Sequence, residues 1–154
     1  MKQNLRTAIV FLMIIIGLSA CKEDNYIDWK VKNELWLETN KTQSGIKTTE
    51  SGLQYKILDE GRLSDRKPSK FSNLYVKYKG SLIDGTVFQA TATSYLNIQS
   101  AVKGWQEALP KIHDGGSILI YIPSDLGYGK DGNGSAVPSH STLIFQIDLI
   151  ASDN

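Results

Sequence analysis

The sequence predicts an α+β fold in which a curved antiparallel β-sheet of five or six strands wraps around one short α-helix. From residue 46 onward, apolar runs alternate with polar residues and end near glycine or proline, as strands do. The pair Asp84-Gly85 lies between apolar residues, which is a strong hairpin signal. Within this region only residues 101–109 carry apolar side chains at helical spacing. A single helix then covers one face of the sheet.

The first predicted strands come from two alternating segments. Residues 53–58 alternate and are followed by Gly61, and residues 74–78 alternate after a polar loop at residues 65–70. Residues 82–88 carry the Asp-Gly turn that closes a hairpin. These segments supply the first half of the sheet.

The second half of the sheet surrounds the helix in sequence. Residues 95–98 predict a weaker, separate strand, and the helix over residues 101–109 is limited by Pro110. Residues 117–122 form an apolar strand ended by Pro123, and residues 142–150 form the last strand, rich in β-branched and aromatic residues.

Composition restricts the possible functions. A chain of 154 residues suggests one domain with appendages. The predicted domain covers residues 46–154, and the appendages precede it. A net charge of +1 gives no field that would attract nucleic acid. His113 and His140 are the two histidines, and neither a second cysteine nor clustered carboxylates accompany them, so we expect no metal site.

The N-terminus has the features of a lipoprotein signal peptide over residues 1–20. Lys2 and Arg6 precede an apolar run at residues 8–16 that is too short for a good membrane span. Leu18-Ser19-Ala20-Cys21 resembles a bacterial lipobox, which predicts a lipid anchor on Cys21; the alternative is an unmodified thiol. The expected location is the outer membrane of the cell envelope. Lys22-Glu23-Asp24 fits either a surface-export signal or a charged tether, so both the periplasmic and the surface face stay open.

Residues 21–45 are expected to form a tether between the lipid anchor and the domain. Within it, residues 25–40 predict a short amphipathic helix or an extended arm, because Ile27, Val31 and Leu35 recur at four-residue spacing beside Trp29 and Trp36. Packing on the domain or a helical spacer is favoured. A membrane-interface role and the docking of a larger envelope complex are the alternatives.

Three large apolar side chains on separate elements of the C-terminal part suggest a pocket. Trp105 enters the predicted helix, Tyr128 lies in a glycine-rich loop and Phe145 lies in the last strand. An aromatic pocket without an obvious nucleophile or metal set is suited to holding a proline ring. The sequence therefore favours prolyl isomerisation.

Residues 48–151 resemble the FKBP-type peptidyl-prolyl cis-trans isomerases, specifically their bacterial lipoprotein form. The resemblance rests on an ordered set of motifs: Gly52-Leu53-Gln54-Tyr55, Val76-Lys77-Tyr78-Lys79-Gly80, Asp84-Gly85-Thr86-Val87-Phe88, Val102-Lys103-Gly104-Trp105, Ile122-Pro123, Gly127-Tyr128-Gly129, Val137-Pro138 and Leu143-Ile144-Phe145. It implies an FKBP-like fold, proline-containing polypeptide clients in the envelope and no cofactor.

The resemblance also implies roles for individual residues. The pocket walls and floor are Tyr78, Phe88, Trp105 and Phe145. The Tyr128 hydroxyl and the Val102 backbone N–H are the expected hydrogen-bond donors to the substrate. The substrate-binding set is completed at the rim by Ala101, Ala136 and Val137.

Gln89 departs from the family pattern, because catalytic members carry Asp after the pocket Phe. An Asp there orients the pocket tyrosine and places a negative charge near the amide, whereas Gln is longer and neutral. Asn133 and Ala136 also replace bulkier rim residues. We therefore expect activity below that of a typical member and little affinity for macrolide inhibitors. The alternative function is a binding module that grips proline-containing segments with little turnover.

Overall fold

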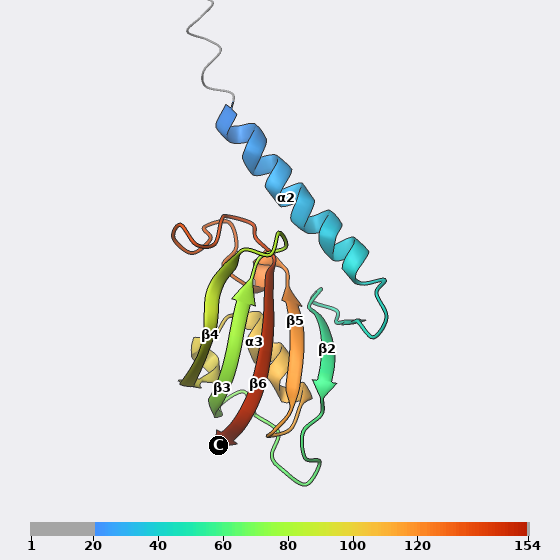
Figure 1. The fold of residues 1–154 in the computed structure, drawn as a ribbon, viewed down its shortest axis with the longest axis vertical. Coiled ribbons are helices and arrows are strands. Elements are labelled where there is room, and N and C mark those ends of the chain that lie inside the picture. Colours follow the sequence, from blue (N-terminus) through green and yellow to red (C-terminus); the bar gives the residue numbers. More distant parts are fainter. Residues whose placement is uncertain (1–20, 154) are drawn as a thin grey trace, which may run out of the picture.

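The computed structural model describes residues 21–153, with side chains from residue 28, and confirms the predicted α+β class. Six antiparallel strands form one twisted sheet in the order β1-β2-β5-β6-β3-β4 (Figure 1). The strands are β1 (Lys47–Thr48), β2 (Gln54–Asp59), β3 (Asn73–Ser81), β4 (Val87–Asn97), β5 (Ser117–Ile122) and β6 (Leu143–Asp153).

Helix α3 (Lys103–Ala108) lies across one face of the sheet and forms the core with it (Figure 1). It is shorter than the predicted 101–109 segment, because Val102 is an extended N-cap residue and a 3₁₀ turn, Leu109–Lys111, continues beyond Ala108. Gly104 lets the helix approach β5 closely: a Cβ at this position would lie 2.6 Å from the Ile122 side chain. This approach carries Trp105 into the core.

The turn between β3 and β4 is the predicted Asp-Gly hairpin. Gly85 has a φ of 86°, in the region that favours glycine. The backbone N–H of Thr86 donates to the Asp84 carboxylate at 2.9 Å, and this hydrogen bond lowers the pKa of Asp84. The side chain thus closes the turn by mimicking a backbone hydrogen bond.

The separate weak strand predicted at residues 95–98 is wrong: β4 is one continuous strand from Val87 to Asn97. Its register with β3 runs from Ser81 opposite Val87 to Asn73 opposite Asn97, with two bulges near Gly80. The segment between its ends carries small and polar residues, because β4 is an edge strand and much of its length is exposed.

Of the two forms predicted for residues 25–40, the structure shows the helix, α2 (Cys21–Asn40). At 20 residues it is not short, and its buried face is not the predicted apolar stripe. Val31 and Leu35 are 43% and 62% exposed, whereas Asn33 is 2% exposed and Asn40 9%. The prediction failed because polar partners elsewhere in the chain, described below, decide which face of α2 is buried.

The predicted signal peptide, residues 1–20, lies outside the described residues. Among the helices that are described, none is both long and apolar enough to cross a membrane.

Candidate active site

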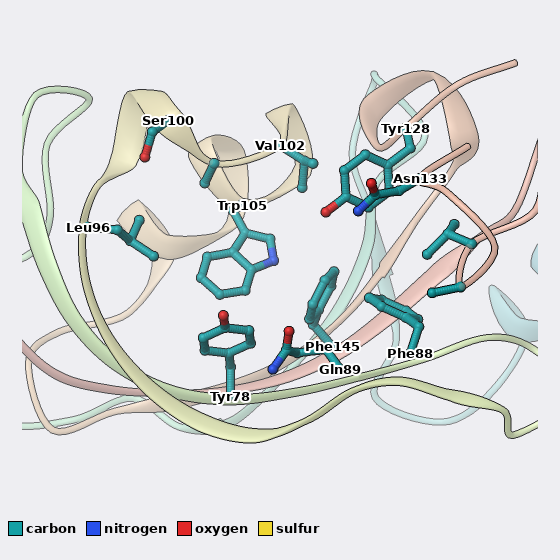
Figure 2. A pocket seen from close by; sticks show the side chains of 13 residues that line it. Tyr78, Phe88, Gln89, Leu96, Ser100, Val102, Trp105, Tyr128, Asn133 and Phe145 are labelled. Atoms are coloured by element: carbon teal, nitrogen blue, oxygen red, sulfur yellow. The ribbon is translucent and has the colours of Figure 1, made fainter. Parts of the chain in front are cut away.

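A cavity of about 250 Å³ opens between α3, the sheet and the loop that joins β5 to β6 (Figure 2). Every side chain predicted for the site lies around this one cavity. Its lining consists of Tyr78, Phe88, Gln89, Leu96, Ser100, Ala101, Val102, Trp105, Tyr128, Asn133, Ala136, Val137 and Phe145. The predicted residues thus gather at one cavity, and their roles stay predictions.

Four aromatic rings, from Tyr78, Phe88, Trp105 and Phe145, form the floor and one wall. Trp105 meets Tyr78 edge to face at a centroid distance of 5.0 Å and Phe145 at 5.2 Å. Phe88 meets Phe145 in the same manner at 5.3 Å. Edge-to-face contacts of this kind fix ring orientation as well as burying area. The pocket is therefore a preformed apolar surface.

Trp105 is the centre of this arrangement and is 4% exposed. Figure 2 shows its indole nitrogen on the side of the ring that faces Phe145 and Tyr128. Among the described residues this buried N–H has no hydrogen-bond partner. A buried N–H without a partner is uncommon, because it has lost its hydrogen bond to water and gained none in return. The floor of the cavity around this N–H is therefore desolvated.

Gln89 lies beside the Tyr78 ring but turns its amide back to its own strand. Its Nε2 donates to the carbonyl of Ala90 at 2.9 Å. No hydrogen bond among the described residues joins Gln89 to Tyr78, whose hydroxyl points toward Trp105 (Figure 2). The carboxylate expected in catalytic relatives is thus replaced by a neutral group that is already engaged.

The opposite wall comes from the rim loop, which we define as residues 127–142. Tyr128 points its hydroxyl toward the cavity in Figure 2, and Val137 is 1% exposed. Asn133 and Val137 exchange two backbone hydrogen bonds, of 2.9 and 3.3 Å. Gly132 has a φ of 67°, and a Cβ there would lie 2.3 Å from the Val137 carbonyl oxygen, so the loop closes tightly only with glycine.

The third side of the cavity is the entry to α3. The Val102 carbonyl accepts a hydrogen bond from the backbone N–H of Trp105 at 2.9 Å, and the Gln106 side chain donates to the Ala101 carbonyl at 2.8 Å. These bonds hold residues 101 and 102 extended at the mouth of the pocket. The Val102 N–H takes part in no hydrogen bond among the described residues.

Leu96 and Ser100 are lining residues that sequence reasoning missed. Leu96 lies near the end of β4, and Ser100 closes the 3₁₀ turn Ile98–Ser100 that leads toward α3. Sequence reasoning treated residues 95–98 as a separate weak strand, which hid that Leu96 lies on the same continuous strand as Phe88.

The lining supports non-covalent chemistry. It contains no carboxylate, histidine, lysine or cysteine. Elsewhere among residues 28–153 no group of three His, Cys, Asp or Glu side chains gathers as metal ligands do. The site offers apolar surface, a few hydrogen-bond donors and a small volume, below the roughly 300–1,000 Å³ typical of pockets for drug-sized ligands.

A flat pH profile is expected from this lining. No side chain of the kind that titrates between about pH 5 and 8 faces the cavity, so kcat/KM should stay constant across that range. The measurement is the rate of X–Pro conversion, the activity that the sequence resemblance implies, at constant ionic strength and with the folded state monitored by circular dichroism. A bell-shaped profile at constant fold would show that a titrating group takes part.

Comparison with known proteins gives a consistent result. The family model described as FKBP-type peptidyl-prolyl cis-trans isomerase matches residues 64–150, and the model for the domain amino terminal to it matches residues 16–57. "Outer membrane protein MIP" of Legionella longbeachae is 39% identical over 126 residues, covering 79% of this chain and 53% of that protein. "Probable FKBP-type peptidyl-prolyl cis-trans isomerase FkpA" of Neisseria meningitidis is 37% identical over 125 residues, covering 79% and 45%.

Solved structures agree with this comparison. The crystal structure of FkpA from Escherichia coli matches with a TM-score of 0.79 at 28% identity, covering 99% of this chain and 72% of that one. A peptidyl-prolyl cis-trans isomerase from Pseudomonas syringae matches with a TM-score of 0.76 at 29% identity, covering 82% and 95%. The chain spans about half the length of the curated relatives it matches.

Proposed function

The chain belongs to the FKBP-type peptidyl-prolyl cis-trans isomerase family, and on that premise we propose that it accelerates rotation about X–Pro bonds in client polypeptides. The observation that carries this proposal is the set of four aromatic rings around a cavity of about 250 Å³. A proline ring needs an apolar surface of this kind. Neither metal nor cofactor enters the reaction, since no covalent bond is made or broken.

The chemistry follows from the nature of the amide. Resonance makes the X–Pro bond partly double, with a rotation barrier of ~18–20 kcal/mol, so uncatalysed conversion takes about 10–100 s. The planar amide is more charge-separated than the twisted one. An apolar, desolvated pocket therefore disfavours the planar ground state relative to the twisted transition state.

Two donors are placed to hold the chain beside the proline. The Val102 N–H lies at the mouth of the pocket, and the Tyr128 hydroxyl points into it (Figure 2). We assign the first to a substrate carbonyl and the second to the carbonyl of the rotating bond. Hydrogen bonds to the chain on either side of the proline use binding energy to hold the X–Pro bond in the geometry that favours rotation.

Gln89 sets the level of activity in this proposal. Replacing it with Asp should raise kcat/KM severalfold, because a carboxylate beside Tyr78 would orient the ring hydroxyl and add charge near the amide. The measurement is cis-to-trans conversion of a short Xaa-Pro peptide by the full-length chain in detergent, beside the Gln89→Asp variant. Gln89→Asn, neutral and with the same backbone preferences as Asp, is the matched control.

Each outcome of this measurement has a definite meaning. Acceleration by the native chain would establish an isomerase that tolerates Gln89. Acceleration by the variant alone would identify a proline-binding module whose pocket is sound. If neither the native chain nor Gln89→Asp accelerates conversion, the assignment of this cavity as the proline site is wrong.

The second candidate, a binding module with little turnover, is favoured by one observation. Gln89 is neutral and its amide is engaged with the Ala90 carbonyl. The pocket lining therefore holds no negative group beside Tyr78. Isomerisation remains the leading function, since the aromatic set and the rim donors all surround the cavity.

We further propose that the chain works in the cell envelope, anchored by a lipid on Cys21. Support comes from the lipobox-like Leu18-Ser19-Ala20-Cys21, from the chain's sole cysteine and from a relative named as an outer membrane protein. Helix α2 begins at Cys21 and its 20 residues span about 30 Å. Because α2 contacts the domain from Trp29 onward, its first eight residues, about 12 Å of helix, would separate the domain from the anchored end.

The lipid anchor makes a testable prediction. Cells fed an alkyne-labelled fatty acid should incorporate the label into the native chain and not into a Cys21→Ala variant, because no other cysteine is present. The native chain should also partition into the detergent phase. A Lys22→Ala variant controls for local change. A label retained by Cys21→Ala would place the lipid at another residue, and an unlabelled native chain would exclude lipidation.

A further inference from the structure

Helix α2 packs against the domain through polar side chains. The Trp29 indole N–H donates to the Ser141 hydroxyl at 3.0 Å, and the Asn33 carbonyl oxygen accepts from the backbone N–H of Thr142 at 2.7 Å. Asn33 and Thr142 are 2% and 1% exposed. These contacts join residues more than 100 positions apart. A helix that served only as a spacer would need none of them.

The second anchor of α2 lies at its C-terminal end. Asn40 donates to the Gln54 side chain at 2.8 Å, Gln54 donates to the Leu37 carbonyl at 2.9 Å, and Trp36 packs on Tyr121 at a centroid distance of 5.5 Å. Both anchors use hydrogen bonds with defined direction. The contacts therefore fix one orientation of α2, which an apolar interface would define less sharply.

The residues that Trp29 and Asn33 of α2 contact belong to the root of the rim loop, residues 138–142. The Ser141 hydroxyl, which accepts from Trp29, donates in turn to the Pro138 carbonyl at 2.7 Å. Pro138 follows Val137, a wall residue of the pocket. A continuous line of hydrogen bonds thus connects α2 to the cavity wall.

The root is also held in an uncommon backbone conformation. His140 has a φ of 57°, in the left-handed region that non-glycine residues rarely adopt. In this conformation its N–H donates to the Gly129 carbonyl at 2.9 Å, beside Tyr128. Strained residues persist only where their surroundings hold them. Contacts from α2 to Ser141 and Thr142, the two residues that follow His140, are part of that support.

We propose that α2 is a positioning element of the pocket and that Asn33 is its principal positioning residue. By fixing the loop root, α2 holds Tyr128 and Val137 at the distance from Trp105 that a proline ring requires. The inference rests on the proposed function for its catalytic consequence. The geometric part, that α2 orders the rim loop, stands on the contacts alone.

Asn33 suits this role because one amide serves both partners. Its oxygen accepts from Thr142, and its Nδ2 donates to the Trp29 carbonyl on the preceding turn of α2 at 2.8 Å. Removing the Asn33 side chain would leave the buried backbone N–H of Thr142 without a partner. An unsatisfied buried donor costs more stability than the net contribution of one hydrogen bond. The floor rings take no part in these contacts, so they should stay in place.

The test compares the full-length chain with Asn33→Ala, Asn33→Asp and, as a control, Val31→Ala, which alters an exposed residue of the same helix. Amide hydrogen exchange of residues 127–142 should become about tenfold faster or more in Asn33→Ala, while β2 and β5 keep their protection. KM for an Xaa-Pro peptide should rise at least about fivefold with little change in kcat. Asn33→Asp keeps the acceptor for Thr142 but loses the donor to the Trp29 carbonyl, so it should restore only part of the protection, and Val31→Ala should match the native chain.

Trp29→Phe provides a second route if Asn33→Ala does not fold, because it keeps an aromatic ring and removes the indole donor. Unchanged loop exchange in both variants, or faster exchange spread evenly over the sheet, would overturn the proposal. Should the native chain show no turnover, the proposed function fails but the inference is still decided, by loop exchange and by the Kd of the peptide. A rise in Kd together with selective loop exchange would support it even then.

Discussion

A single methyl group added at Gly80 is expected to weaken the binding of a proline-containing peptide at least about tenfold while the sheet stays folded. Gly80 lies in β3 opposite Gln89 on one side and Phe145 on the other. A Cβ there would lie 2.6 Å from Phe88 Cζ and 2.8 Å from Phe145 Cε1. Both rings must move, and the cavity is the nearest open space. Overpacking of this kind costs about 1–3 kcal/mol, so Gly80→Ala should remain folded.

The measurement is the Kd of an Xaa-Pro peptide beside the free energy of unfolding. We expect Kd to rise at least about tenfold, which corresponds to 1.4 kcal/mol. Gly116→Ala is the matched control, since its Cβ would lie 2.9 Å from the Asp59 carbonyl oxygen, at residues outside the pocket lining. It should lower stability and leave Kd unchanged. The double variant Gly80→Ala/Phe88→Leu should recover part of the affinity; unchanged binding in Gly80→Ala would exclude the ring packing described here.

Trp105→Ala is expected to remove activity and much of the stability together. The indole is 4% exposed and contacts both Tyr78 and Phe145 edge to face. Truncating a buried Trp costs about 3–5 kcal/mol. Because the remaining rings lose their common neighbour, kcat/KM should fall by about 100-fold or more. Urea unfolding and peptide conversion measure the two effects.

The control for Trp105 separates stability from chemistry. Ile118 is fully buried in β5 and does not line the cavity, so Ile118→Ala should cost about 2–5 kcal/mol. Its kcat/KM should stay near the native value at temperatures where it is folded. Equal losses of kcat/KM in both variants would mean that instability, and not the missing indole, explains the effect of Trp105→Ala.

The pocket could be predicted from the sequence because its residues come from motifs with recognisable spacing. Trp105 enters a short helix, Tyr128 lies between glycines and Phe145 lies in the last strand, and the structure brings all three to one cavity. The strands were predictable for a related reason, since alternation follows directly from a half-buried sheet.

Helix α2 shows where such reasoning fails. Four-residue spacing selected Val31 and Leu35 as the inner face, yet Asn33 and Asn40 are buried. Periodicity assumes that burial follows hydrophobicity, and here it follows hydrogen-bond partners. Those partners, Thr142 and Gln54, lie far along the chain, and no local pattern announces them. Strand β4 was divided for a similar reason, because an exposed edge lacks the apolar signal that would mark its middle.

The sheet order has a consequence for how the chain reaches its native state. Strand β6, the last of the described strands to be synthesised, lies in the interior of the sheet between β5 and β3. Until it is available, β1, β2 and β5 form one half-sheet, and β3 and β4 form another, with no direct pairing between the halves. Phe145 and the far end of the rim loop arrive with this strand. The domain therefore completes its core and its pocket in one late, long-range step, which slows folding and exposes two open edges beforehand.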